Sequence, residues 1–148
     1  MGLGYFDKKN NEYVITEMFP RRPLINYLWS DTVFCALEHF GGGTISARVN
    51  TEKRVFIGGE NLVYIKENGE YYSANRNFFR EKFDVYETHV GLGYHKIISE
   101  YKGIRTEQTI LIPKDGFAQI NNIKVTDLTG KARKIDLYSY IQIGRAHV

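Results

Sequence analysis

The sequence has few of the residues that crosslink or stiffen a chain. Cys35 is the only cysteine, and there are 3 prolines among 148 residues. With a single thiol no internal disulfide is possible, and this usage is compatible with a reducing compartment. Cys35 lies in the apolar stretch TVFCALE, which favours a small buried side chain over a nucleophile. We therefore expect a cytoplasmic protein.

Long apolar stretches and blocks of one charge are also missing. No apolar stretch approaches the roughly 20 residues of a membrane-spanning helix, and residues 1–15 lack the basic and apolar parts of a secretion signal. The net charge is +3, and the bases are interleaved with acids instead of forming a stripe along which a phosphate backbone would lie. We expect neither a membrane nor a nucleic acid as a partner.

Motifs for cofactors and metals are incomplete. The GLGY stretch, residues 91–94, lacks the third glycine of a dinucleotide fingerprint, because Lys96 stands there. The GGGT stretch, residues 41–44, is not closed by the Gly-Lys-Ser/Thr of a P-loop. No metal-ligand spacing joins the histidines, which are His39, His89, His95 and His147. We expect no metal, no organic cofactor and no catalytic residue in this chain.

Aromatic residues are abundant, at 14% of the chain, and Tyr and Phe favour half-buried sheet surfaces. Short apolar stretches recur about every ten residues, with turn residues between them. The turn pairs are Gly58-Gly59, Asn68-Gly69 and Lys102-Gly103, and residues 128–131 form a further turn. Asn-Gly is typical of a type I′ hairpin. The pattern predicts an all-β fold, an antiparallel β-sandwich or barrel.

Two segments near the N-terminus are harder to interpret. Residues 20–30, PRRPLINYLWS, look like a proline-stiffened connection. Residues 31–40 form either the one plausible helix or a buried strand, because VFCALEHF is too short and too apolar for its period to decide. The three glycines that follow end whichever element it is. For His89, beside Glu87, a hydrogen-bonded structural role and a functional role both stay open.

Two blocks of the sequence resemble the cellobiose phosphorylase family, glycoside hydrolase family 94. The first is GYFDKKNNEYVIT followed by PRRPLINYL, where family members open with Gly-Tyr-Phe-Asp, Glu-Tyr-Val-Ile-Thr and Ile-Asn-Tyr-Leu-Gly. The second is FDVYETHVGLGYHKI, similar to the family's Phe-Glu-x-x-His-Gly-x-Gly-Tyr. Trp29 and Val90 each replace a family glycine. The resemblance covers residues 4–142 and favours the sandwich, incomplete at its C-terminal end.

The resemblance implies an inverting phosphorylase of β-linked gluco-disaccharides or short oligosaccharides, with inorganic phosphate as co-substrate and a homodimeric assembly. Such enzymes have an N-terminal β-sandwich, a helical linker, a helical catalytic domain and a small C-terminal β-part. Residues 1–142 would form the first portion of the sandwich. The catalytic Asp and the phosphate-binding residues would lie outside this chain, so that the chain alone would be inactive.

The clearest departure from the family is the glycine stretch FGGGTISARVNTEKR, where members carry Ala-Gly-Gly-Tyr-Ser-Phe-Tyr. Glycines let backbone approach a ligand closely, hydroxyls bond sugar hydroxyls, and an arginine offers a planar donor fork. The candidate substrate-binding residues are therefore Gly41, Gly42, Gly43, Thr44, Ser46 and Arg48. Alternatively, the last three alternate outward on a strand that begins after the glycines.

The final residues, 143–148, have the sequence IGRAHV. Back-translated as ATC GGA AGA GCA CAC GTC, they match the start of a widely used short-read sequencing adapter, whose next codon, TGA, is a stop. We expect these residues to be translated adapter and the native strand to continue past Gln142; the alternative is a genuine terminus.

Two other function classes stay open. One is a stand-alone carbohydrate-binding module with an aromatic face formed by Tyr71, Tyr72, Phe78 and Phe79. The other is a structural or dimerisation module without a ligand.

Overall fold

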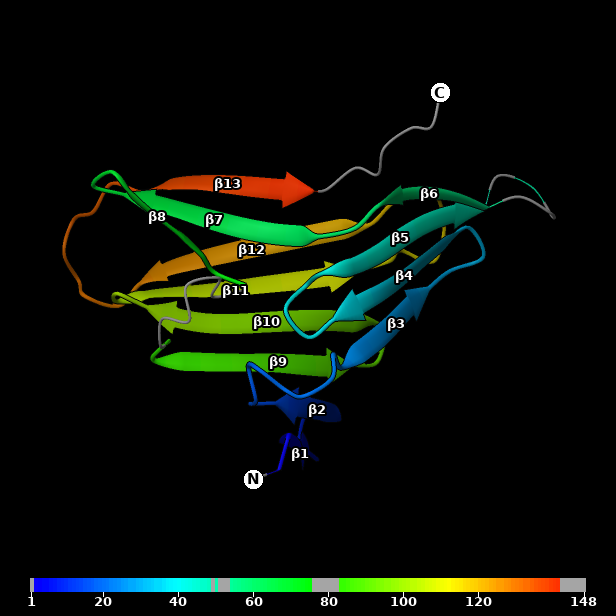
Figure 1. The fold of residues 1–148 in the computed structure, drawn as a ribbon, viewed down its shortest axis with the longest axis horizontal. Coiled ribbons are helices and arrows are strands. Elements are labelled where there is room, and N and C mark those ends of the chain that lie inside the picture. The colour runs from blue at the N-terminus through cyan, green and yellow to red at the C-terminus, as the bar shows by residue number, and fades with distance from the viewer. Residues whose placement is uncertain (1, 49, 51–53, 76–82, 142–148) are drawn as a thin grey trace.

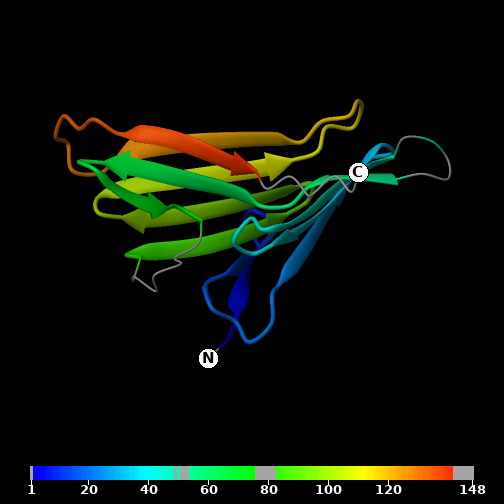
Figure 2. The same cartoon turned by 45° about the horizontal axis from the view of Figure 1, so that its top comes forward.

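The fold is an antiparallel β-sandwich in a computed structural model that describes residues 2–48, 50, 54–75 and 83–141. Two small sheets lie side by side over one face of a six-stranded sheet (Figures 1 and 2). No helix with the length and hydropathy needed to cross a bilayer occurs in this described part of the chain. The predicted all-β antiparallel sandwich is therefore confirmed.

The sheets are built almost entirely from neighbouring antiparallel strands. The six-stranded sheet, in the order β1-β2-β9-β10-β11-β12, consists of β1 (Gly4–Asp7), β2 (Glu12–Ile15), β9 (Val85–Gly91), β10 (Tyr94–Tyr101), β11 (Ile104–Leu111) and β12 (Ile120–Asp127). The four-stranded sheet is β3 (Ile25–Trp29), β4 (Val33–Glu38), β5 (Gly43–Arg48) and β6 (Arg54–Gly58). The three-stranded sheet, in the order β13-β7-β8, consists of β13 (Asp136–Ile141), β7 (Asn61–Glu67) and β8 (Glu70–Ser73).

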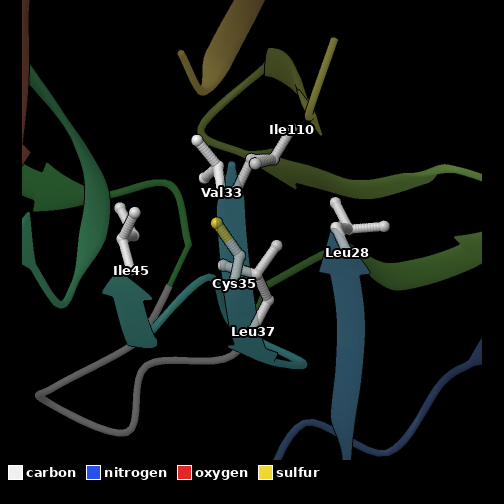
Figure 3. Packing of buried hydrophobic residues seen from close by; sticks show 6 residues of the cluster. All are labelled: Leu28, Val33, Cys35, Leu37, Ile45 and Ile110. Atoms are coloured by element: carbon white, nitrogen blue, oxygen red, sulfur yellow. The ribbon is translucent and has the colours of Figure 1, made fainter. Parts of the chain in front are cut away.

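Alternating apolar side chains fill the space between the layers. One cluster joins the four-stranded sheet to the C-terminal end of β11 (Figure 3) and consists of Leu28, Val33, Cys35, Leu37, Ile45 and Ile110. A second joins the three-stranded sheet to the start of β11 and consists of Val63, Ile65, Ala74 and Ile104. Cys35 is a free thiol with no exposed surface, as predicted, and burial raises its pKa to about 11. The sandwich therefore has an apolar core under each small sheet.

Two predicted hairpins form as expected. Asn68-Gly69 joins β7 to β8 with positive φ at both residues (50° and 84°), as a type I′ turn requires. Lys102-Gly103 joins β10 to β11 in the same way, with φ of 51° and 73°. The adapter prediction for residues 143–148 lies outside the described residues.

Four sequence predictions need correction or completion. Residues 25–29 form β3, because the two prolines stiffen only the start of the predicted connection. Residues 33–38 form a strand and not a helix, since they pair on both sides with β3 and β5. Gly58-Gly59 does not turn a hairpin, because β6 pairs with β5 while β7 pairs with β13 and β8. The connection from β12 to β13 likewise passes between two sheets.

Candidate functional site

Gly41 and Gly42 lie in the turn between β4 and β5, Gly43 begins β5, and the turn is packed into the protein. Gly41 and Gly42 are buried, and the Gly41 N–H donates to the Glu38 carbonyl at 2.8 Å. Gly41 and Gly43 have φ of 87° and 129°, where side chains are disfavoured. A Cβ on Gly43 would lie 1.9 Å from the Ala36 carbonyl oxygen. Backbone geometry is thus sufficient reason for glycine here.

The other predicted site residues lie on β5, where Gly43 is already the first strand residue. Thr44 and Arg48 are exposed and Ser46 is half-buried, while Ile45 and Ala47 between them point into the core. The Arg48 Nε donates to the Asn50 carbonyl at 3.2 Å. The structure therefore places Thr44, Ser46 and Arg48 on one outward face, apart from the buried glycine turn. Their role toward a substrate stays a prediction.

Aromatic side chains share this outward face. Cross-strand register aligns Trp29 with Phe34 and Phe34 with Ser46 in one row. A second row consists of Tyr27, Ala36 and Thr44. Trp29 is 72% exposed and Tyr27 52% exposed. We call the two rows together the outer aromatic face; it is the reverse side of the apolar surface drawn in Figure 3.

The outer aromatic face does not follow from the sequence prediction, because that prediction treats residues 20–30 as a connection. A signal was present in the alternation of Ile25, Tyr27 and Trp29 with Asn26 and Leu28, which is the period of a half-buried strand.

A network of buried polar groups lies beneath the glycine turn. The Asn75 Nδ2 donates to Gln108 Oε1, while Asn75 Oδ1 accepts from the Val63 N–H at 2.6 Å. The Gln108 Nε2 donates to the Asn61 carbonyl at 3.1 Å, and the Asn61 N–H donates to the Gly41 carbonyl at 3.0 Å. These hydrogen bonds connect β7, β11 and the turn, so the network fixes the position of the turn.

Two buried histidines border this region. His39 Nε2 lies 3.0 Å from the Met18 carbonyl, whereas in the described residues neither ring nitrogen of His95 has a hydrogen-bond partner. Burial, together with the nearby His39 and against a weaker opposing interaction with the Glu38 backbone, lowers the pKa of His95 to about 4. His95 is therefore neutral in the folded protein near pH 7.

This histidine predicts a loss of stability in acid. Between pH 6.5 and about 4 the unfolded chain binds a proton at His95 and the folded protein does not, so stability falls as pH falls through this window. Unfolding free energies from urea titrations should fall by up to about 1.4 kcal/mol per pH unit on account of this group. His95→Leu should remove that part of the slope, and equal slopes in both proteins would contradict the prediction.

The outer side of the six-stranded sheet carries a second polar cluster, around Glu12. His89 Nδ1 lies 2.6 Å from Glu12 Oε2, and its Nε2 lies 3.1 Å from Glu87 Oε2. Tyr94 and Lys96 donate to the other Glu12 oxygen. Burial raises the pKa of Glu12, but these hydrogen bonds and the charges of His89 and Lys96 outweigh it, and its pKa lies below the usual value.

This cluster joins the two blocks that carry the family resemblance, because Glu12 belongs to the first block and His89 and Tyr94 to the second. His89 thus has the structural, hydrogen-bonded role that the sequence left open. In the second block, the Tyr94 ring packs directly over Gly91, where an added Cβ would lie 2.2 Å from the ring. Among the described side chains, no group of three or more His, Cys, Asp or Glu is placed to hold a metal ion.

The aromatic face proposed for a stand-alone module does not form on β8. Tyr71 is exposed, but Tyr72 points to the other side and packs against the core with Val63, Ile65, Ala74 and Ile104. Successive strand residues face opposite ways, so these two rings cannot stack on one sugar. Phe78 and Phe79 lie outside the described residues.

The fold is that of an antiparallel β-sandwich domain whose four-stranded sheet carries aromatic rings and hydroxyls on its outer face. A family profile described as "Glycosyl hydrolase 94, supersandwich domain" matches residues 11–147. The chain therefore belongs to the glycosyl hydrolase 94 family, as the two sequence blocks predicted.

Named relatives point to the same family. The chain is 28% identical to a solabiose phosphorylase of Paenibacillus borealis over 153 residues, which cover 95% of this chain and 20% of that protein. It is also 28% identical over 160 residues to an N,N'-diacetylchitobiose phosphorylase of Vibrio proteolyticus, covering 100% of this chain and 20% of the relative. A 3-O-beta-D-glucopyranosyl-beta-D-glucuronide phosphorylase of Paenibacillus borealis is 29% identical over 140 residues, which cover 92% of this chain and 18% of that protein. The chain thus spans about a fifth of the length of these relatives.

Proposed function

We propose that this chain is the N-terminal, non-catalytic part of the sandwich of a longer inverting glycoside phosphorylase. The observation that carries the proposal is the supersandwich match over residues 11–147 together with relatives named as disaccharide phosphorylases. The substrates we propose are β-linked gluco-disaccharides or short oligosaccharides, with inorganic phosphate as co-substrate. We further propose that the longer protein is a homodimer and acts in the cytoplasm, where the lone thiol of Cys35 would remain reduced.

In the proposed reaction, phosphate is the nucleophile and one carboxylic acid is the proton donor. A phosphate oxygen attacks the anomeric carbon, and the bond from that carbon to the glycosidic oxygen breaks. An Asp outside this chain protonates the leaving oxygen, so that a β-linked substrate gives an α-sugar 1-phosphate, with the inversion known from two-carboxylate hydrolases. The sandwich would contribute binding surface and support, without supplying the acid or the nucleophile.

The test uses the longer protein encoded by the gene that contains this chain. We expect cellobiose, laminaribiose or N,N'-diacetylchitobiose to be cleaved only when phosphate is present, with an α-sugar 1-phosphate as the product in phosphorus and proton NMR spectra. The 148-residue chain alone should show no turnover. Cleavage without phosphate, a β-sugar 1-phosphate or no cleavage of any β-linked sugar would contradict the proposal.

Within this proposal, β5 contributes to substrate binding through Thr44, Ser46 and Arg48, while the buried Gly41 and Gly42 hold the turn that precedes it and do not face a ligand. Their placement at the outward surface of β5 supports contact for the three side chains. Thr44→Ala, Ser46→Ala and Arg48→Ala are each expected to lower kcat/KM for phosphorolysis in the longer protein by more than about threefold, because each removes a donor to a sugar or phosphate oxygen. Three variants that stay within threefold of the parent enzyme would show that this segment is structural.

A further inference from the structure

We propose that the outer aromatic face of the four-stranded sheet binds one β-linked disaccharide. In this site Tyr27 and Trp29 stack on one sugar ring, and the hydroxyls of Thr44 and Ser46 bond the other. The choice of a sugar as the ligand rests on the proposed function. The site itself rests on strand register, exposure and ring geometry.

The two rings are presented to solvent at the edge of the sheet. Tyr27 and Trp29 are two residues apart on β3 and therefore point to the same side. They are 52% and 72% exposed. A β-linked glucosyl ring has equatorial hydroxyls, so its two faces present mainly C–H groups. Such a face packs well against the face of an aromatic ring, whose large apolar area favours burial.

The orientation of Tyr27 is fixed before any ligand arrives. Its ring stacks on that of Phe34, with ring centroids 5.8 Å apart and an interplanar angle of 27°. These residues are diagonal neighbours on β3 and β4, a distance that aromatic side chains can bridge. A ring that is already held in place loses little conformational entropy on binding. Phe34 is therefore a positioning residue for the site.

The hydroxyl groups lie at a suitable distance from the rings. Thr44 is separated from Tyr27 by Ala36, and Ser46 is separated from Trp29 by Phe34. Two strand spacings amount to about 10 Å, comparable to the length of a disaccharide. Ala36 lies between Tyr27 and Thr44, and because its side chain is small, the surface of the sheet is lower there than at Tyr27. A second sugar ring can then lie over Ala36 with its hydroxyls toward β5.

A groove beside the rings sets the size of the first sugar. It has a volume of about 190 Å³ and is lined by Tyr27, Leu28, Trp29, Gly93 and Ile112. This volume lies below the roughly 300 Å³ at which pockets for drug-sized ligands begin, so the groove suits one sugar ring. The turn between β9 and β10, which contains Gly93, forms its far wall. The groove therefore bounds the ring site at the β3 edge, on the side of the turn between β9 and β10.

The experiment uses the intrinsic fluorescence of Trp29, the only tryptophan in the 148-residue chain. Cellobiose and N,N'-diacetylchitobiose are titrated into the chain, with sucrose as a sugar that has no β-glucosidic link. We expect a saturable blue shift of the emission with at least one β-linked sugar and none with sucrose. Tyr27→Ala should raise the half-saturation concentration at least about tenfold, a loss of about 1.4 kcal/mol.

A matched control is Tyr71→Ala, which removes an exposed tyrosine from β8, outside the proposed site, and should leave the titration unchanged. The combined variant Thr44→Ala/Ser46→Ala should weaken binding several-fold and carries the test if Tyr27→Ala fails to fold by circular dichroism. No saturable response to either β-linked sugar, or an unchanged titration with Tyr27→Ala folded, would overturn the site. An emission shift that follows protein concentration without sugar would also overturn it, in favour of a second copy on this face.

Failure of the proposed sugar site can be distinguished from failure of the proposed function. Phosphorolysis by the longer protein without sugar binding at Trp29 would refute only the site. Sugar binding at Trp29 by a protein without phosphorolysis would refute only the proposed enzyme.

Discussion

Replacing Gly43 by alanine is expected to destabilise the protein by about 3–5 kcal/mol, at the upper end of single substitutions. The new Cβ would lie 1.9 Å from the Ala36 carbonyl oxygen, and the φ of 129° is one that alanine rarely adopts. Both problems can be relieved only by moving β5 away from β4, which breaks ladder hydrogen bonds. Urea titrations should show a lower midpoint with a similar slope.

The matched control for this prediction is Gly69→Ala in the turn between β7 and β8. Gly69 also has a positive φ, 84°, but nothing lies within 4 Å of its added Cβ. Gly69→Ala should therefore lower the free energy of unfolding by only about 1 kcal/mol, which is the conformational cost of a positive φ alone. Equal losses at the two glycines would show that the clash with Ala36 is relieved cheaply. They would also reopen a ligand-facing explanation for the glycines.

Breaking the buried amide network is expected to cost about 2–4 kcal/mol for either Asn75→Ala or Gln108→Ala. Each substitution leaves buried groups without their hydrogen bonds: the Val63 N–H for Asn75 and the Asn61 carbonyl for Gln108. An unsatisfied buried polar group bears its full desolvation cost. Because the two side chains bond each other, the double variant should lose at least about 1 kcal/mol less than the sum of the single losses.

The exposed pair Asp7 and Asn10 provides the comparison for the network. Asn10 Nδ2 donates to Asp7 Oδ2 at 2.7 Å on the surface, and Asn10→Ala should change stability by no more than about 0.5 kcal/mol. Additive losses at Asn75 and Gln108 would mean that these residues act independently. The glycine turn would then be held by its local hydrogen bonds alone.

The local features of the sequence were sufficient for much of the fold. The pairs Asn68-Gly69 and Lys102-Gly103, each between two apolar stretches, identify two hairpins, because glycine readily adopts the positive φ that both turns contain. The aromatic and β-branched residues of EYVI and DLYSYI are typical of strands, and these segments form β2 and β13. The two family blocks identified the class of domain before any partner strand was known. All of these signals come from neighbouring residues.

The division into three sheets was decided only by the tertiary structure. β7 pairs with β13, in which each residue lies 70 to 80 positions after its partner (Lys66 with Asp136, Asn61 with Ile141), and not with β6, which precedes it. The two arrangements present the same alternation of side chains, so strand period cannot distinguish them. The two arrangements differ in which face of each strand packs against apolar side chains of the six-stranded sheet. Ile45 shares a buried cluster with Ile110, and Ile65 shares another with Ile104.

The candidate site was likewise determined partly by the sequence and partly by the tertiary structure. The sequence by itself identified Thr44, Ser46 and Arg48 as alternating polar side chains after the glycines, and composition alone gave the single tryptophan and the small net charge. Tertiary structure decided that Tyr27 and Trp29 face the same way as Thr44 and Ser46, and that the glycine turn is buried over Asn61. The physical reason is that a strand's period fixes which residues share a side, whereas packing between distant segments decides which side faces water.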